Sequence, residues 1–361
     1  MSTLEARRQI RRLIELGARR GLAAAERALD AAGVAGIPAG PLPPAPRLER
    51  ELGPGRLAVE ARYASTLLYD RLDPANIAEI ERRVDDWPDL RDQLDANPDP
   101  AERRCMLLAF GIWLAVPGLL EGTGLLSAQP PYEVHAMARG PLSAAGGLYE
   151  ADMIASALAS AGVDLSDVAG GLDFGCSSGR VVRVLAAAYP QTDWHGCDPN
   201  AEAIAWATHA LPAIDFFRSG EHPPLPLADA SLDLVFAISI WSHFEPALGL
   251  RWFDEMHRLI APGGHLVFTT HGLASVEHYA ARDLRTADQS AEIAAALYSR
   301  GSWYAPEFGA DGDWGVVNPS WGTAFLSPEW VLTNLLPNWR VLEFAPGRNQ
   351  CNQDVYVLRR V

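Results

Sequence analysis

The chain has 361 residues, 48% of them hydrophobic and 21% charged, and a formal net charge of −15. These values are typical of a soluble globular protein of two or three domains, and they exclude disordered and collagen-like chains. All 30 cationic residues are arginine. The absence of lysine excludes a Schiff-base lysine, and with it pyridoxal-phosphate catalysis, a lysine-dependent phosphate loop and a protein-kinase lysine.

The N-terminal segment differs in charge from the rest of the chain. Residues 1–50 contain nine arginines and five acidic residues, whereas residues 51–361 contain 21 arginines and 40 acidic residues. An acidic body repels a phosphate backbone, so nucleic acid is not expected as a partner. Residues 3–32 have a helical pattern, and eight of the fourteen residues 33–46 are Gly or Pro. We expect residues 1–46 to be a basic helical arm and linker that docks on an acidic partner or a membrane surface or mediates a homodimer; the alternative is a helix that is solvated or packs on the chain itself.

Residues 47–140 are predicted to form an all-helical cap domain, because the pattern there is helical throughout. Asp99 followed by Pro100 is typical of a helix start. The longest uncharged apolar run, from Met106 to Leu120, has 15 residues. It is too short for a transmembrane helix and indicates a buried helix.

The four cysteines lie far apart, at positions 105, 176, 197 and 351. Their spacing indicates neither a zinc site nor a disulfide framework, and the N-terminus shows no signal peptide. These features favour a reducing, cytoplasmic location.

Residues 141–361 alternate between apolar strands and helices of ten to fifteen residues. Strands are predicted at 172–174, 194–197, 214–217, 232–239, 265–270, 339–345 and 354–358. Helices are predicted at about 148–161, 179–189, 200–210, 246–260 and 328–336. This order predicts an α/β, Rossmann-like fold, a mostly parallel seven-stranded sheet with helices on both faces and ligands at the carboxyl ends of the strands.

The segment LDFGCSSGR (172–180) carries the functional argument. An apolar strand, an acidic residue, a glycine turn and a helix follow one another, as in nucleotide-binding loops. A dinucleotide loop requires G-x-G-x-x-G, whereas only Gly175 and Gly179 are present, in a G-x-x-x-G spacing. Asp173, directly before the turn, opposes a pyrophosphate and suits a cationic ligand.

At this point the chain resembles the class I S-adenosylmethionine-dependent methyltransferases of the small-molecule type, with similarity to methyltransferase types 11 and 12. The segments that carry the resemblance follow the family order: LDFGCSSGR (172–180), HGCDPN (195–200), PPLPLADASLDLVFAISIWSHFE (223–245) and LIAPGGHLVFTTHG (259–272). The ending QDVYVLRR (353–360) is similar to the last strand of some members. One departure is Ser177, which stands where the family usually has glycine.

The resemblance implies S-adenosylmethionine as cofactor and a binding site made of Asp173, Gly175, Cys176, Ser177, Gly179, Asp198, Pro199, Asn200, Ile238, Ser239 and Trp241. Asp173 and Gly175 would face the methionine part, and Asp198 would bind both ribose hydroxyls. Pro199 and Asn200 would flank the adenine, while the residues from 238 to 241 would lie beside the transferred methyl group.

Two points of this binding site stay open. The usual acidic contact to the adenine amino group is not evident after the third strand, so Glu221 and His222 are the alternatives. Cys176 is interpreted as a small loop residue rather than a nucleophile, because no histidine is placed to activate it.

Two histidines are candidates for a general base. His243 follows the fourth strand and His271 follows the fifth, and the methyl group would lie at this edge of the sheet. Each has a structural alternative: His243 as the residue that opens the next helix, and His271 as a buried loop histidine. Glu245 is a weaker candidate. No metal ion is predicted.

Residues 272–326 form an insertion rich in aromatic residues, among them Tyr279, Trp303, Trp321 and Phe325. Aromatic walls suit a sugar face or an aromatic metabolite, so this segment is predicted to be a lid that selects the acceptor. The alternative is a lid core that packs against Trp330. By analogy with glycan and secondary-metabolite methyltransferases, an acceptor of that kind is expected.

The leading hypothesis is therefore O-methylation of a hydroxyl on a small molecule, sugar or glycan, with a histidine as general base. Methylation of an amine or carboxylate in a small molecule or protein is the second. A cofactor-binding scaffold without catalysis is the third, and a nicotinamide oxidoreductase is opposed by the incomplete dinucleotide motif.

Overall fold

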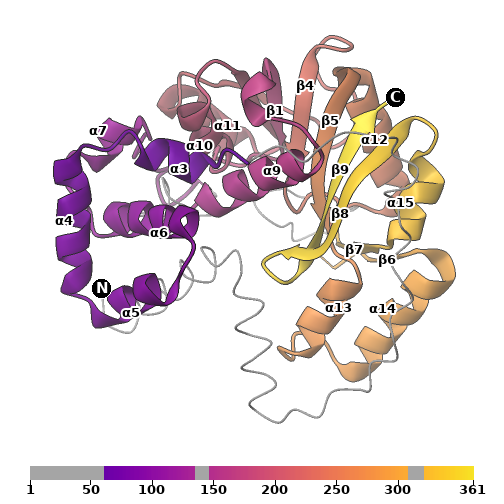
Figure 1. Ribbon diagram of the computed structural model, residues 1–361. Helices are drawn as coiled ribbons and strands as arrows, with labels where there is room; N and C mark the ends of the chain where they lie inside the picture. The colour runs from indigo at the N-terminus through magenta and orange to yellow at the C-terminus, as the bar shows by residue number, and fades with distance from the viewer. Residues whose placement is uncertain (1–60, 135–145, 308–320) are drawn as a thin grey trace.

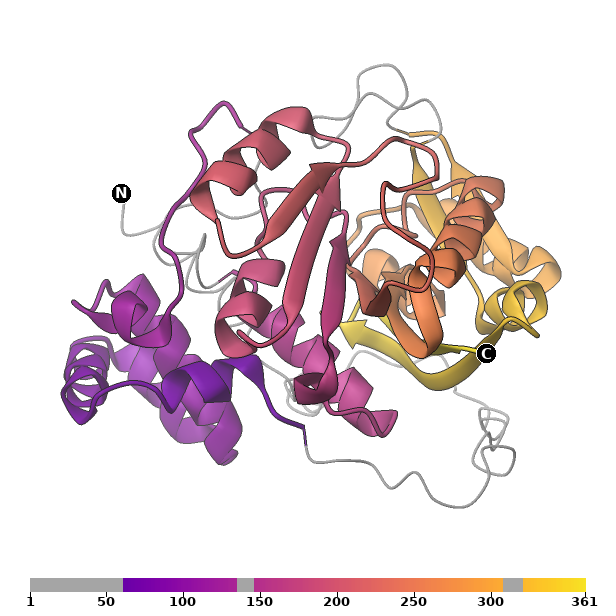
Figure 2. The same ribbon diagram turned by 90° about the horizontal axis from the view of Figure 1, so that it is seen from above.

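The computed structural model describes residues 61–134, 146–307 and 321–361. The predicted arm and linker, residues 1–46, lie outside these ranges, as do residues 47–60 and 135–140 of the predicted cap. A helical unit precedes a sheet with helices on both faces, and the two lie side by side (Figure 1, Figure 2). In the described ranges no helix is long and apolar enough to cross a membrane.

The helical unit contains α3 (Ala64–Tyr69), α4 (Pro74–Asp85), α5 (Pro88–Ala96), α6 (Pro100–Trp113) and α7 (Leu119–Thr123). Three of these helices begin with proline, whose missing N–H is not needed in the first turn. Asp99 caps α6 by accepting hydrogen bonds from the backbone N–H groups of Ala101 and Glu102.

The apolar run from Met106 to Leu120 is not one helix, because α6 ends at Trp113 and α7 begins only at Leu119. The turn between the two helices contains Ala115, with a positive φ of 53°, and Pro117, which cannot donate a helical hydrogen bond.

The sheet contains β1 (Gly170–Phe174), β2 (Asp193–Asp198), β3 (Asp215–Arg218), β4 (Leu232–Ala237), β5 (Ile260–Thr270), β8 (Trp339–Asn349) and β9 (Gln353–Arg360). Its strand order is β3-β2-β1-β4-β5-β9-β8. The first five strands pair in parallel, and β9 pairs antiparallel with both β5 and β8. The prediction of a mostly parallel seven-stranded Rossmann-like sheet is therefore confirmed.

Five helices cover the two faces of the sheet: α9 (Leu148–Ser160), α10 (Val182–Ala188), α11 (Ala201–Ala210), α12 (Pro246–Leu259) and α15 (Pro328–Leu335). One apolar core joins the sheet to α9 and α10 and continues into the helical unit. The second core joins the opposite face to α12 and α15. Burial on both faces explains why β4 is apolar at nearly every position.

The insertion between β5 and α15 contains α13 (Leu273–Ala280), α14 (Ala287–Arg300), β6 (Ser302–Ala305) and β7 (Thr323–Leu326). Phe325 is fully buried, and its ring contacts those of Tyr279 and Trp303. Part of the aromatic content of the insertion therefore forms its own small core. Isolated bridges from Trp321 to Phe244 and from Phe325 to His271 attach the insertion to the carboxyl edge of the sheet.

Candidate active site

A cavity of about 300 Å³ lies at the carboxyl ends of β1, β2 and β4, and we call it the edge cavity. Its walls come from segments 173–181, 238–243 and 349–353, together with Glu150, Asp198 and Trp321. Parallel strands place their carboxyl ends at one edge, so segments far apart in the sequence meet there. Most of the residues that the sequence assigned to the cofactor line this single cavity.

The loop after β1 is shaped by glycine and by hydrogen bonds to β2. The backbone N–H groups of Gly175 and Cys176 both donate to the carbonyl of Cys197, at 2.9 and 3.0 Å. Gly175 has a φ of +83°, and a Cβ there would lie 2.1 Å from Ile240. No other residue fits this position, because both the conformation and the space exclude a side chain.

Ser177 adopts a left-handed conformation with a φ of 49°, although it is not glycine. Its backbone N–H donates to Oδ2 of Asp198 at 2.8 Å, which fixes the loop against the end of β2. The hydroxyl of Ser177 is buried and has no hydrogen-bond partner. The serine therefore fits the glycine position, at the cost of backbone strain.

Two buried aspartates lie on either side of this loop. Oδ2 of Asp173 accepts a hydrogen bond from the N–H of Val182 at 3.2 Å. Burial raises the pKa of Asp173 to about 8, against the smaller opposing effects of that hydrogen bond and of Arg180. Burial also raises the pKa of Asp198, whose oxygens accept from the N–H groups of Ser177 and Asn200. An acidic, half-enclosed site of this kind favours a cationic ligand.

An ion pair that the sequence analysis missed lines the same cavity. Arg180 approaches Oε1 of Glu150 at 2.8 Å, and the Glu150 side chain is only 3% exposed. Arg180 directly follows the glycine loop, and Glu150 is on α9, the helix that precedes β1. The position of Arg180 beside the loop was a usable signal in the sequence, whereas nothing local marked Glu150.

His243 is the histidine that faces the edge cavity. Its Nδ1 lies 3.0 Å from the carbonyl oxygen of Gly322, and its ring stacks on Trp321 with an interplanar angle of 5°. Because a carbonyl oxygen only accepts, Nδ1 carries the proton in the neutral ring and Nε2 carries the lone pair. The ring therefore has its basic nitrogen opposite the nitrogen that anchors it.

His271 lies behind the cavity wall and is not among the residues that line it. Its Nδ1 faces the carbonyl of Ala324 at 3.2 Å, and its Nε2 accepts from the hydroxyl of Tyr279 at 2.9 Å. Burial, with a smaller contribution from His243, lowers the pKa of His271 to about 3. The ring is therefore neutral and its basic nitrogen is already engaged.

Gln353, at the start of β9, is a second residue that the sequence analysis missed. Its Oε1 accepts from the hydroxyl of Thr269 at 2.7 Å, and its Nε2 donates to Oγ of Ser239 at 2.6 Å. Its Nε2 also lies 3.4 Å from Nε2 of His271. Gln353 thus joins the ends of β4, β5 and β9 under the cavity.

Residues 172–264 match the family described as a methyltransferase domain. The matched segment begins at β1 and contains the loop, Asp198 and His243. This segment is a class I S-adenosylmethionine-dependent methyltransferase domain. S-adenosylmethionine is accordingly the cofactor of the domain.

Known proteins similar to the methyltransferase domain match only part of this chain. A malonyl-[acyl-carrier protein] O-methyltransferase of Methylococcus capsulatus is 31% identical over 29% of this chain and 38% of its own length. A trans-aconitate 2-methyltransferase of Azoarcus sp. is 31% identical over 29% of this chain and 40% of its own length. The chain thus spans about two fifths of these relatives.

Among solved structures, a SAM-dependent methyltransferase from Methanosarcina mazei is 19% identical, with a TM-score of 0.37. The similarity covers 53% of this chain and 92% of that chain.

Some residues predicted to bind the cofactor do not line the edge cavity of the methyltransferase domain. Trp241 is 1% exposed and stacks on Phe253 in the core beneath α12, so it does not reach the cavity. Gly179 turns the chain with a φ of +77° where a Cβ would press on Leu211. Asn200 caps α11 by accepting from the N–H groups of Glu202 and Ala203.

The remaining predicted residues lie in the cavity wall or next to it. Ile238 and Ser239 line the edge cavity. Pro199 lines a small adjoining hollow together with Asp198 and Glu221, whereas His222 lines neither space. Cys176 is in the wall, and burial raises the pKa of its thiol well above the usual value, which agrees with its interpretation as a loop residue.

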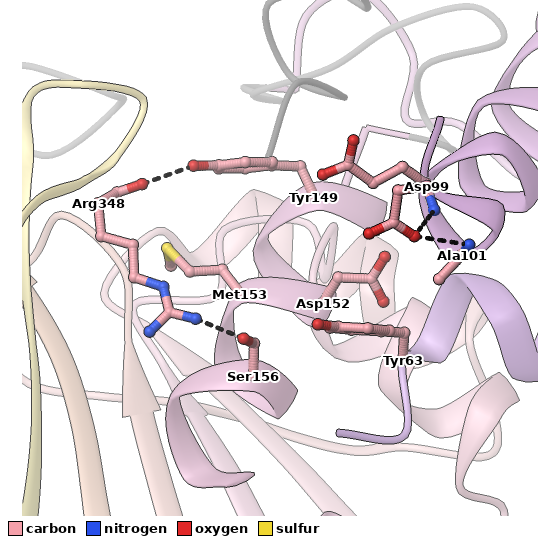
Figure 3. A pocket seen from close by; sticks show the side chains of 9 residues that line it. Tyr63, Asp99, Ala101, Tyr149, Asp152, Met153, Ser156 and Arg348 are labelled. Atoms are coloured by element: carbon pink, nitrogen blue, oxygen red, sulfur yellow. Dashed lines mark hydrogen bonds between the residues drawn. The ribbon is translucent and has the colours of Figure 1, made fainter. Parts of the chain in front are cut away.

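A second cavity, of about 220 Å³, lies between the helical unit and the elements α9 and β8, and we call it the seam cavity. It is lined by residues from α6, α9 and β8, together with Tyr63 (Figure 3). Asp152 accepts hydrogen bonds from the backbone N–H and the hydroxyl of Ser65. The Tyr149 hydroxyl donates to the carbonyl of Arg348 at 2.8 Å, as Figure 3 shows.

Proposed function

We propose that this chain transfers a methyl group from S-adenosylmethionine to a hydroxyl of an uncharged small molecule, sugar, glycan or natural product. His243 is the proposed general base. The observation that carries the proposal is that His243 lines the same cavity as the loop after β1, with its Nδ1 anchored on a carbonyl and its Nε2 basic.

The residues of the edge cavity fit the charge of the cofactor. S-adenosylmethionine supplies an electrophilic methyl group on a positively charged sulfur that already leaves readily. Glu150 and Asp198 provide carboxylates around that charge. Asp198 would hold the ribose hydroxyls, because it ends β2 beside the loop, and Pro199 and Glu221 would flank the adenine in the adjoining hollow.

His243 would take the proton of the acceptor hydroxyl on Nε2 as the oxygen becomes bonded to carbon. The Gly322 carbonyl stabilises the resulting imidazolium, because it accepts a hydrogen bond from the Nδ1–H group in both charge states of the ring. Trp321, stacked on the ring, holds it in one plane and presents an aromatic wall next to the acceptor. His271 is assigned a supporting role through Gln353.

The charge of the cavity favours a hydroxyl over a carboxylate as the acceptor. The two relatives are named for malonyl-[acyl-carrier protein] and trans-aconitate, whose acidic groups require a cation for recognition. Among the described residues of the cavity wall, Arg180 is the only arginine, and Glu150 pairs with it. An anionic acceptor would meet net negative charge.

Calorimetry on the full chain tests the cofactor assignment. S-adenosylhomocysteine is expected to bind, and preferential binding of NAD would contradict the proposal. Methyl transfer from labelled S-adenosylmethionine into a fractionated cell extract would then identify the acceptor. The absence of any labelled product with every fraction, despite cofactor binding, would favour a non-catalytic scaffold.

The variant His243→Gln tests the base. We expect kcat to fall about a hundredfold with little change in cofactor affinity, because general-base catalysis contributes at least that much to proton removal. The control is His209→Gln on the exposed face of α11, which should leave turnover unchanged. Full turnover in His243→Gln would instead favour an amine or carboxylate acceptor, which needs no strong base.

A further inference from the structure

Four residues that line the edge cavity, Glu150, Ser177, Asn349 and Asn352, carry a buried side-chain oxygen without a hydrogen-bond partner, and two of them, Glu150 and Asn349, are buried residues. Oε2 of Glu150 and Oδ1 of Asn349 are buried, have no hydrogen-bond partner, and belong to residues that line the cavity. The two residues are 3% and 6% exposed. Unpaired buried acceptors are costly, so their presence in a cavity wall indicates a ligand that brings N–H donors.

The guanidinium of Arg180 lies beside Glu150 in the wall of the edge cavity. Arg180 contacts Oε1 of Glu150 and additionally donates to the carbonyl of Gly146 at the start of α9. Glu150 therefore uses one oxygen for Arg180 and leaves the other for a ligand. An unpaired carboxylate oxygen beside a guanidinium is the complement of an α-amino acid zwitterion, whose ammonium and carboxylate groups are attached to the same carbon.

Asp173 is poorly suited to bind that ammonium group. One of its oxygens holds the N–H of Val182 at the start of α10, and its side chain is 3% exposed. Its pKa, raised to about 8 by burial, leaves it largely protonated near neutral pH without a ligand. Its role is to join the loop to α10.

The Tyr149 hydroxyl connects the backbone segments that carry Glu150 and Asn349. It donates to the carbonyl of Arg348 and accepts from the N–H of Gln350 at 3.0 Å, so α9 and the β8–β9 hairpin are joined beside the cavity. Glu150 and Asn349 each follow one of these joined residues in sequence. These hydrogen bonds hold the segments that carry both oxygens in fixed positions, which lowers the entropy cost of ligand binding.

We propose that Glu150 and Asn349 bind the α-ammonium group of the cofactor's methionine part, and that Arg180 binds its α-carboxylate. This inference rests on the cofactor assignment of the proposed function, and it places the ammonium contact on Glu150 and Asn349 rather than on Asp173. It also makes the hairpin 349–353 a wall of the amino-acid end of the cofactor site.

Three ligands with different amino-acid ends, the third of which also lacks the sulfonium charge, test the proposal by calorimetry on the full chain. S-adenosylmethionine carries both charges, decarboxylated S-adenosylmethionine carries only the ammonium, and 5′-methylthioadenosine carries neither. We expect Glu150→Gln to lower the affinity for the first two ligands about tenfold, since a hydrogen bond to a charged group is lost. Binding of 5′-methylthioadenosine should stay within about twofold of wild type, because that ligand never reaches Glu150.

Arg180→Gln should lower the affinity for S-adenosylmethionine about tenfold and leave the affinity for the decarboxylated ligand unchanged. The matched control is Glu255→Gln, which disrupts a buried Glu–Arg pair with Arg258 outside the cavity. Its thermal midpoint should fall, while the relative affinities for the three ligands stay the same.

The outcomes separate this inference from the proposed function. If wild type binds none of the three ligands, the cofactor assignment and this inference both fail. If wild type binds S-adenosylmethionine and Glu150→Gln binds it equally well, only the inference is wrong. If Glu150→Gln loses 5′-methylthioadenosine to the same extent, Glu150 supports the loop and does not contact the ammonium group.

Discussion

The two cavities on either side of α9 differ in how their polar atoms are paired. Glu150 lines the edge cavity, whereas Tyr149 and Asp152, its near neighbours in sequence, line the seam cavity. The edge cavity has unpaired buried oxygens on Glu150 and Asn349. In the seam cavity, no described side chain has a buried polar atom without a partner.

This difference separates a binding site from a structural contact. The carboxylates of the seam cavity are used within the chain: Asp99 caps α6, Glu102 accepts from Asn97, and Asp152 accepts from Ser65. Asp152 holds the helical unit against α9, whereas Asp99 and Glu102 are used within the helical unit. In the edge cavity, by contrast, some buried acceptor oxygens receive no hydrogen bond from the chain, so a ligand is needed to supply the donors.

The largest effect is expected for Asp198→Ala in the edge cavity. The variant removes the proposed acceptor for the ribose hydroxyls, and it removes the acceptor for the N–H groups of Ser177 and Asn200. We expect the affinity for S-adenosylhomocysteine to fall by about a hundredfold or more, measured by calorimetry. Retention of near wild-type affinity would remove Asp198 from the cofactor site.

For the seam cavity, Asp152→Ala is expected to lower stability and not cofactor affinity. The variant leaves the buried N–H and hydroxyl of Ser65 without an acceptor, so we expect the free energy of unfolding to fall by about 2 to 3 kcal/mol. Affinity for S-adenosylhomocysteine should be unchanged. Denaturant unfolding and calorimetry on the same preparation check both, and a selective loss of affinity would contradict the structural role of this cavity.

The pH dependence of stability distinguishes Asp173 from a paired carboxylate. Its pKa is about 8 in the folded chain and near 4 when unfolded, so the folded state holds the proton more tightly. The contribution of Asp173 to stability is therefore fully present below about pH 4 and is lost as the pH rises towards 8.

Asp173→Asn should remove this contribution. Without ligand, the stability of the variant relative to wild type should rise between pH 5.5 and 8 by roughly 2 to 3 kcal/mol, measured by denaturant unfolding. Asp354, whose pKa burial raises to about 7, contributes in the same direction in both proteins and does not change the comparison. A difference independent of pH would show that Asp173 is ionised in the folded chain.

The smallest effect is expected for Ser177→Gly. Glycine adopts a φ of 49° without strain, although it also raises the entropy of the unfolded chain. We expect a net gain of about 0.5 kcal/mol in stability and unchanged cofactor affinity. Weaker cofactor binding would indicate that the unpaired hydroxyl of Ser177 contacts the ligand.

Local sequence pattern predicted the architecture well, because strands buried on both faces are short continuous apolar runs, whereas amphipathic helices repeat every 3.6 residues. The seven strands of the sheet are at the predicted places, although β5 begins at Ile260 rather than at His265. The apolar run from Met106 was less well predicted, because composition alone does not show that the chain turns before Pro117.

The sequence by itself determined the loop after β1, the carboxylate that ends β2 and the class of the domain, because each depends on residues that are adjacent or related by one βαβ unit. Only the tertiary structure decided which histidine faces the cavity. His243 and His271 occupy equivalent strand ends, but the insertion buries His271 and leaves His243 in the wall.

Tertiary structure also decided that Glu150, Arg180 and Asn349 line one cavity. These residues come from α9, the loop after β1 and the end of β8, and no short-range pattern records which side of α9 packs against the hairpin. That choice follows from burial of the Tyr149 ring and satisfaction of its hydroxyl, which depend on partners about 200 residues away.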